Sequence, residues 1–144
     1  MGSFNAAFDW LGVQRAWTRT RGSPDVIIAN IDTALPADVD FAGLKGVAPA
    51  ARILSVQYAP NPGAQALDLG HAIEYAVEHG ACIINVAPGA NLATPLVQRA
   101  IQYAAARNAL VVCAACEPGD APLSANGAAN VVRVLGVNAD CRPL

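Results

Sequence analysis

The stretch VIIANIDTAL, from Val26 to Leu35, decides how the chain is expected to fold. Apolar residues, several of them β-branched, fill it as far as Ile31 except at Asn30, which is typical of a strand that is covered on both faces. Asp32 follows at once, at the carboxyl end of that strand, where open α/β sheets place their ligand chemistry. Asp32 is therefore the first candidate for a functional residue. The alternative is an aspartate that only starts a turn.

The composition indicates one apolar and lightly charged domain, residues 1–144, in which residues 1–24 lead into the first strand. Hydrophobic residues make up 54% of the chain and charged residues 14%, and the mean hydropathy is +0.35. No apolar run approaches the roughly 20 residues of a membrane span, and the first residues lack a signal peptide, so we expect a soluble, cytoplasmic protein without a membrane partner. The net charge is −2 and Lys45 is the only lysine, which argues against nucleic acid as a partner.

The cysteines predict neither a disulfide framework nor a metal site. In a chain without export signals they are expected to be thiols: Cys82, Cys113, Cys116 and Cys141. Cys113 and Cys116 form a C-x-x-C, but residues three apart on an extended strand point to opposite faces. We expect small thiols filling tight space, no metal ligands and no cofactor.

The hydrophobic periods predict alternating strands and helices. Strands are expected over 26–31, 52–58, 82–87, 110–115 and 131–137, and helices over 65–79 and from 95 to about 107. Gly80 is placed to end the first helix, Thr94 and Pro95 to start the second, and Asn108 to close it. The strand at 52–58, with Leu54 alternating against Ile53, is expected nearer the sheet edge.

This order of elements is an α/β fold with an open parallel sheet of about five strands. Right-handed crossovers that run the same way across a sheet put both main helices on one face. No helix is predicted for the other face, although parallel sheets normally have both faces covered. We expect that face to be covered by a second copy, by a partner protein or by the N-terminal segment.

Several motifs in order resemble the subtilisin-like serine proteases (subtilases, peptidase S8). The motifs are Leu11-Gly12-Val13 with Ala16-Trp17, then VIIANIDTAL, Gly46–Ala51, Ala72–Ala76, Ile83–Val86 and Ala114-Ala115. Asp32 matches the catalytic aspartate, with Ala34 where the family usually has glycine. The resemblance covers nearly the whole chain and implies a three-layer fold with one helix layer largely missing.

The departures from the family pattern concern the catalytic groups. The His-Gly-Thr-His block and the Gly-Thr-Ser segment are absent, and the only histidines, His71 and His79, fall in and at the end of the first helix. Glu117 stands where the family has the oxyanion-hole asparagine, and a carboxylate there would repel the developing charge. The resemblance therefore implies a pseudoprotease, not an enzyme, with Asp32 and Glu117 as relic positions.

The family's substrate-holding segments are retained. The resemblance places peptide binding by strand addition on two segments: Asn61, Pro62, Gly63 and Ala64, and Ala87, Pro88 and Gly89. A plain turn at 60–63 is the alternative, and Pro88 lacks an N–H for pairing.

The leading hypothesis is a non-catalytic accessory protein that holds a peptide in extended form, for example a precursor in the bacterial maturation of ribosomally made peptides (RiPP biosynthesis). One alternative is a structural subunit that docks, as a homodimer or on a partner, through its uncovered sheet face. Others are one part of a split protease, or an unrelated hydrolase that uses Asp32 with Glu117 as acid and base.

Overall fold

The fold is an open parallel sheet of five strands with helices packed on one face. A computed structural model describes residues 8–33, 46–58, 68–87, 92–114, 130–134, 136 and 138. The strands are β1 (Ile27–Asp32), β2 (Arg52–Gln57), β3 (Ile83–Val86), β4 (Leu110–Ala114) and β5 (Val131–Val134). Their order in the sheet is β2-β1-β3-β4-β5, and all pairs are parallel. The predicted α/β class, strand number and edge position of β2 are confirmed.

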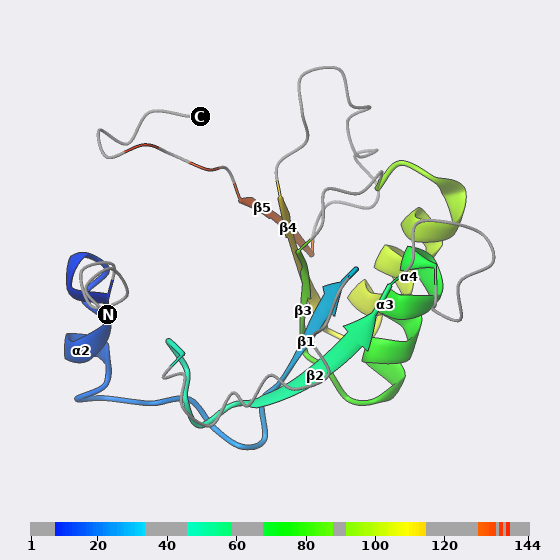
Figure 1. Ribbon diagram of the computed structural model, residues 1–144. Helices are drawn as coiled ribbons and strands as arrows, with labels where there is room; N and C mark the ends of the chain where they lie inside the picture. Colours follow the sequence, from blue (N-terminus) through cyan, green and yellow to red (C-terminus); the bar gives the residue numbers. More distant parts are fainter. Residues whose placement is uncertain are drawn as a thin grey trace.

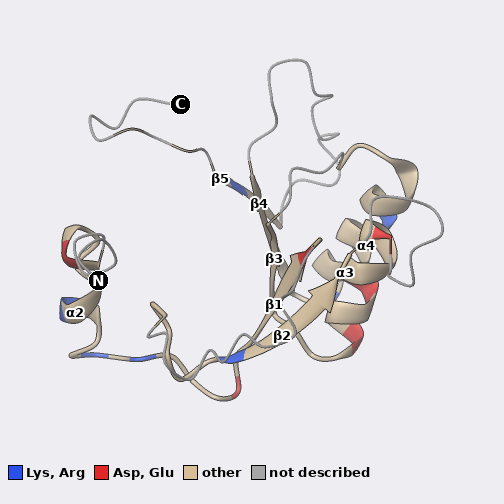
Figure 2. Ribbon diagram, in the orientation of Figure 1, with Lys and Arg blue, Asp and Glu red and all other residues tan. Residues whose placement is uncertain are grey.

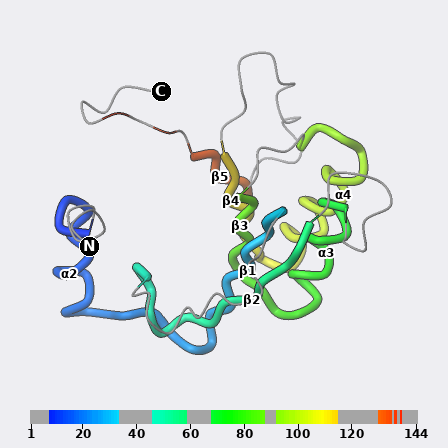
Figure 3. The backbone as a smooth tube through the Cα atoms, viewed as in Figure 1, coloured from blue at the N-terminus to red at the C-terminus, as the bar shows by residue number. Residues whose placement is uncertain are grey.

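The helices α3 (Leu69–Glu78) and α4 (Pro95–Ala105) lie together on one face of the sheet, as Figure 1 shows. Each helix joins two parallel strands, and both crossovers run toward β5, so the handedness rule puts both helices on the same side. This confirms the prediction made from the order of elements. The short helix α2 (Val13–Ala16) lies on the opposite side of the sheet, apart from it (Figure 3).

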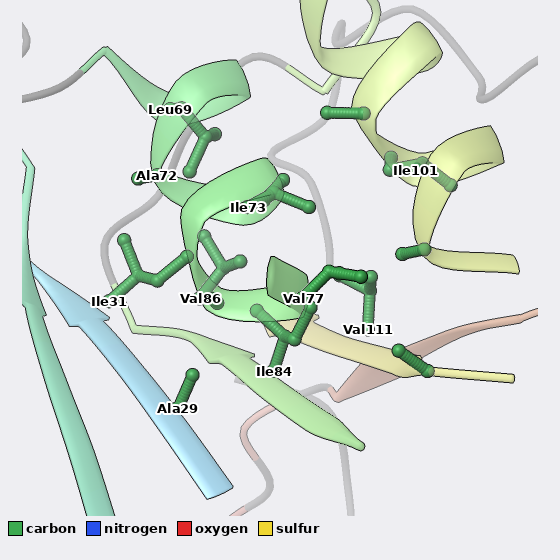
Figure 4. Close-up of a cluster of buried hydrophobic side chains, with 14 of the residues drawn as sticks. Ala29, Ile31, Leu69, Ala72, Ile73, Val77, Ile84, Val86, Ile101 and Val111 are labelled. Atoms are coloured by element: carbon green, nitrogen blue, oxygen red, sulfur yellow. The ribbon is translucent and has the colours of Figure 1, made fainter. Parts of the chain in front are cut away.

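The hydrophobic core fills the space between the sheet and these two helices. Ala29 and Ile31 of β1, Ile84 of β3 and Val111 of β4 are completely buried there, opposite Ile73 of α3 (Figure 4). Burying an isoleucine or valine side chain contributes about 1.5–3 kcal/mol each. The covered side of the sheet therefore accounts for most of the hydrophobic stabilisation of the fold.

The two helices approach each other closely at Gly70. A Cβ atom added there would lie 2.6 Å from Cγ of Leu96 and 3.3 Å from its backbone carbonyl carbon. Glycine lowers helix stability by about 1 kcal/mol relative to alanine, so its place in the first turn of α3 is explained by this contact. The absent side chain lets α4 pack directly against α3.

Local signals set the ends of the helices. The Thr94 hydroxyl accepts a hydrogen bond from the Val97 amide, with Pro95 as the first helical residue, and Asn108 takes a positive φ of 57° after α4. Gly80, with a φ of 80°, follows α3. These predictions are confirmed.

The predicted start of the first helix at residue 65 is wrong. Asp68 is extended, and its carboxylate accepts a hydrogen bond from the amide of His71, so α3 begins at Leu69. A carboxylate that caps a helix has to lie outside it.

The N-terminal segment is held by Trp17. The indole N–H donates to the carbonyl of Val47 at 2.8 Å, the Phe8 ring meets the indole edge to face, and the Arg21 guanidinium lies 5.0 Å from the ring centre. These contacts leave Trp17 half-buried, whereas Trp10 is 71% exposed.

Among the described residues, no helix combines the length and apolar character that a membrane span requires.

Candidate functional site

Asp32 ends β1 with its side chain on the face that the helices leave uncovered. Successive residues of a strand point to opposite faces, and Ala29 and Ile31 point into the helix-covered core. The Asp32 carboxylate accepts a hydrogen bond from the amide of Thr33 at 2.7 Å. A hydrogen bond to the next amide is typical of an aspartate that starts a turn. It agrees with the alternative interpretation of Asp32 as a turn residue.

Both histidines of the chain belong to the α3 region. His71 lies in the first turn of α3, and its ring Nδ1 is 2.6 Å from Oδ2 of Asp68. His79 follows the last turn, with Nδ1 2.8 Å from the carbonyl oxygen of Tyr75 and its ring stacked on the Tyr75 ring at 3.8 Å. Because α3 covers the other face, strand alternation puts the Asp32 side chain on the side of the sheet opposite the α3 region and its two histidines.

The Asp68–His71 pair is a helix cap. Slight burial raises the pKa of Asp68, but hydrogen bonds from the His71 amide and ring outweigh it and hold the pKa below its ordinary value of 3.8. The side chains are 49% and 57% exposed, so the pair stands in solvent on the outer surface of α3. No described hydroxyl or thiol is hydrogen-bonded to the His71 ring.

We call the uncovered side of the sheet the open face. It is formed by every second residue of each strand, beginning with Ile28 in β1, Ile53 in β2, Ile83 in β3, Leu110 in β4 and Val132 in β5. Four of its aliphatic side chains are well exposed: Ile53 (51%), Leu110 (37%), Val132 (43%) and Val134 (53%). Within the described strands the charged residues are Asp32, Arg52 and Arg133 (Figure 2), and strand alternation puts only Asp32 on this face.

An asparagine pair interrupts the apolar surface of the open face. Asn30 and Asn85 are aligned on adjacent strands, and the Asn85 amide donates to Oδ1 of Asn30 at 2.7 Å. Ser55 flanks the pair on one side and Val112 on the other. The central strands β1 and β3 were expected to be apolar on both faces, and this is wrong at Asn30 and Asn85 on the open face. The two amides are tolerated there because each satisfies part of the other's hydrogen-bonding capacity.

Of the predicted peptide-binding residues, only Ala87 is described. It is exposed at the carboxyl end of β3, and its amide donates to the carbonyl of Ile31 at 3.1 Å, so that donor already belongs to the sheet. The other predicted positions and one relic position lie outside the described residues: Asn61, Pro62, Gly63, Ala64, Pro88, Gly89 and Glu117.

The part of the chain that the structure describes contains no group of three or more His, Cys, Asp or Glu side chains able to hold a metal ion. Cys113 is 4% exposed and lies in the hydrophobic core, as expected for a thiol that fills space, and Cys116 lies outside the described residues. Cys82 is exposed, with Sγ 3.6 Å from the carbonyl oxygen of Ile27.

Comparisons with known proteins agree on one family. The model of the Subtilase family (Peptidase S8) matches residues 26–139. A curated relative, a thermophilic serine proteinase from Bacillus sp. (strain AK1), is 37% identical over 78 residues, which are 54% of this chain and 20% of the relative. The chain thus spans about a fifth of that protein.

Solved structures with the same fold include peptide-maturation enzymes. The prenylagaramide maturation protease PagA superimposes with a TM-score of 0.73 at 25% identity, over 92% of this chain and 61% of PagA. A lanthipeptide protease gives 0.57 at 25% identity, over 70% of this chain and 42% of that one. The PatG macrocyclase in complex with peptide gives 0.63 at 18% identity, over 92% of this chain and 64% of PatG, a likeness of fold alone.

Proposed function

This chain belongs to the subtilase family, and we propose that it holds a peptide in extended conformation without cleaving it. The observation that carries the proposal is that Asp32 points to the face of the sheet opposite α3, the helix region to which both histidines belong. In the setting that the matched proteases favour, the peptide is a precursor in the maturation of ribosomally made peptides in the cytoplasm, and this chain is an accessory protein.

The proposal that the peptide is not cleaved is supported by what the triad mechanism requires. A serine nucleophile needs an imidazole within hydrogen-bond reach, and that imidazole needs the aspartate on its other nitrogen. Here His71 bonds to Asp68 and His79 to the Tyr75 carbonyl, both on the face away from Asp32. Glu117, where the family has its oxyanion-hole asparagine, adds a negative charge where a donor is needed.

Peptide binding is supported by the retained sheet edge. Strand addition relies on backbone groups, which a chain can keep after losing its catalytic side chains. Asp32 and Ala87 lie at the carboxyl ends of adjacent strands, the edge at which α/β sheets bind ligands. Since the Ala87 amide is bonded to Ile31, we assign the pairing groups to the segments 61–64 and 88–89.

The test is calorimetric titration of the full chain with a synthetic precursor peptide encoded beside its gene. Gly63→Leu and Gly89→Leu should each weaken binding at least about tenfold, because side chains there would obstruct a paired backbone. Gly46→Leu is the matched control, since a Cβ at Gly46 would meet nothing within 4 Å. Unchanged affinity in both Gly63→Leu and Gly89→Leu would contradict the assigned binding segments.

A second candidate function is that of a structural subunit, which is favoured by the exposed aliphatic residues of the open face. Leu110 and Val132 on adjacent strands are 37% and 43% exposed, in a class of sheet that is normally covered on both faces. The occupant could be a second copy or another polypeptide, and a polypeptide that supplies the missing catalytic groups would make this chain one part of a split protease. Analytical ultracentrifugation tests this candidate, because a monomer at every accessible concentration and no mass shift with a co-purifying partner would contradict it.

A further inference from the structure

Two exposed apolar surfaces of this chain lie on the same side of the sheet. One is the open face. The other belongs to the N-terminal arm, residues 8–21, on which Trp10 is 71% and Leu11 is 63% exposed. Figures 1 and 3 show the arm on the side that α3 and α4 leave uncovered, apart from the strands. Among the described residues, no apolar side chain covers either surface, and each surface offers the other an apolar partner.

We infer that two copies of this chain form a dimer in which the arm of each copy covers the open face of the other. The inference rests on the second candidate function and is independent of peptide binding. The open face is thus covered by a second copy of the chain, and the residues of that copy that make the contact are those of its arm.

Two hydrogen bonds hold the arm in a position apart from its own sheet. The Trp17 indole N–H bonds to the Val47 carbonyl at 2.8 Å, and the Ala50 amide bonds to the Arg21 carbonyl at 3.0 Å, so two hydrogen bonds tie the arm to the lead-in of β2. With the arm held in this way, Trp10 remains exposed and so does Val134 of the open face, at 53%. A second copy can reach both surfaces without breaking these bonds.

The charges of the two surfaces are complementary. The arm carries Arg15, Arg19 and Arg21 against one acid, Asp9. Among the described residues of the open face the one charge is that of Asp32. An arginine-bearing arm therefore meets a face whose only described charge is negative, which favours this pairing over two open faces in direct contact, where the two Asp32 carboxylates would approach each other.

The area available is that of an ordinary dimer. Five strands about 4.8 Å apart, each a few residues long at about 3.3 Å per residue, form a face of roughly 400 Å². Covering it removes a similar area of the arm from water, and a two-fold exchange makes the contact twice, for a total of about 1,600 Å². A single contact of half that size would fall in the range of weak encounters.

The asparagine pair gives this interface a polar centre. Asn30 and Asn85 bond to each other, and each amide keeps hydrogen-bonding capacity beyond that bond. Arg15 is exposed and lines the same surface hollow as Trp10 and Leu11, so the arm presents a polar group beside its apolar anchors. Because the two amides need polar partners from the arm, they allow only one alignment of the arm on the sheet. A single buried asparagine fixes the alignment of a coiled coil in the same way.

Sedimentation equilibrium on the full chain tests the exchange. The wild type should have twice the 14.8 kDa chain mass at micromolar concentration. Trp10→Asp, which removes the arm anchor, and Val132→Lys, which charges the open face, should each raise the dimer dissociation constant at least about tenfold. Tyr75→Ser is the matched control, since Tyr75 is a large side chain exposed to 38% on α3, away from both surfaces, and the dimer should persist.

A mixing experiment distinguishes exchange from direct contact between two open faces. Trp10→Asp keeps an intact open face and Val132→Lys keeps an intact arm, so mixing the two variants restores one of the two contacts and should give heterodimer. A dimer that survives Trp10→Asp would overturn the exchange. A wild type that sediments as a monomer would also overturn it. A third contradicting result is a different protein that protects the open face from hydrogen exchange while this chain forms no dimer. Circular dichroism confirms folding of each variant, and peptide titration, unaffected by either substitution, separates this inference from the proposed peptide binding.

Discussion

The two faces of the sheet are made by the same strands but follow different rules. On the covered face, alternate residues of β1 and β3, including Ile31 and Ile84, are completely buried under α3 and α4. On the open face, the residues between them include the hydrogen-bonded pair Asn30 and Asn85. One face is uniformly apolar and determines the fold. The other combines apolar and polar groups in fixed rows, as a surface that recognises a partner does.

The two faces also differ in which of the acid and base residues they carry. Asp32 projects on the open side, whereas His71 and His79 belong to the covered side, in solvent beyond the core. In this arrangement neither imidazole is hydrogen-bonded to the Asp32 carboxylate, the contact that a catalytic triad requires. The proposal of binding without hydrolysis rests on this separation of Asp32 from the histidines. The proposal of association rests on the exposed aliphatic residues of the open face.

The largest expected difference between the faces is in stability. Ile84→Ala on the covered face should lower the free energy of unfolding by about 3 kcal/mol, since it leaves a cavity in a closed core. Ile53→Ala, at a side chain 51% exposed on the open face, should cost less than about 1 kcal/mol. Urea titration measures both, on a Trp10→Asp background so that association does not contribute. Equal losses would contradict the distinction between the faces.

A second prediction concerns the contact between α3 and α4 above the covered face. Gly70→Ala should destabilise the chain by about 1–2 kcal/mol, because the clash of the new Cβ with Leu96 outweighs the roughly 1 kcal/mol gain in helix propensity. Gly46→Ala, which introduces a Cβ into open space, should be neutral within about 0.5 kcal/mol in the same urea titration. A stabilised Gly70→Ala variant would show that the helices can separate at no cost.

The sequence predicts the covered face much better than the open one. Periodicity of apolar residues identifies the strands and helices, and the crossover rule alone puts the helices together. The start of α3 was missed by four residues because Asp68 acts as an N-cap and no apolar period marks it. The polar row at Asn30 and Asn85 could not be predicted, since alignment of two strands distant in sequence depends on register.

The sequence also identifies the candidate site only in part, because the face on which a residue lies depends on the fold. The family resemblance identified Asp32, and the structure adds that it occupies the open face whereas both histidines belong to the α3 region on the other side. Exposure of Trp10 was not predictable, because an aromatic residue near a terminus has the same sequence signature whether it packs or not.

The cap of α3 should give a smaller, pH-dependent effect. Asp68→Ala should cost about 1 kcal/mol at pH 7, and Asp68→Asn, which keeps an acceptor oxygen, distinctly less. Because hydrogen bonds from His71 hold the pKa of Asp68 below 3.8, its carboxylate contributes stability above that pH and loses it as the pH falls through the lower folded-state pKa. Thermal unfolding of wild type and Asp68→Ala should therefore converge only in strong acid, and a difference that persists there would contradict a charged cap.

The smallest expected effect is the coupling of the asparagine pair on the open face. Asn30→Ala and Asn85→Ala should each cost about 0.5–1.5 kcal/mol, and the double variant less than their sum by about 0.5–1 kcal/mol. Ser55→Ala, beside the pair, should show no coupling with Asn85→Ala. Strict additivity of Asn30→Ala and Asn85→Ala in urea unfolding would mean that the amides do not act as a pair.

The central claim, that this chain binds peptide and leaves it intact, is tested most directly by one measurement with two readouts. The synthetic precursor peptide is titrated into wild type and Asp32→Asn by calorimetry, and the peptide is recovered afterwards for mass spectrometry. We predict affinities that agree within about twofold, since the Asp32 carboxylate has one hydrogen bond among the described residues, from the amide of its neighbour Thr33, and a peptide of unchanged mass in both samples. Cleavage products that appear with wild type and disappear with Asp32→Asn would contradict the account, and so would the absence of any binding.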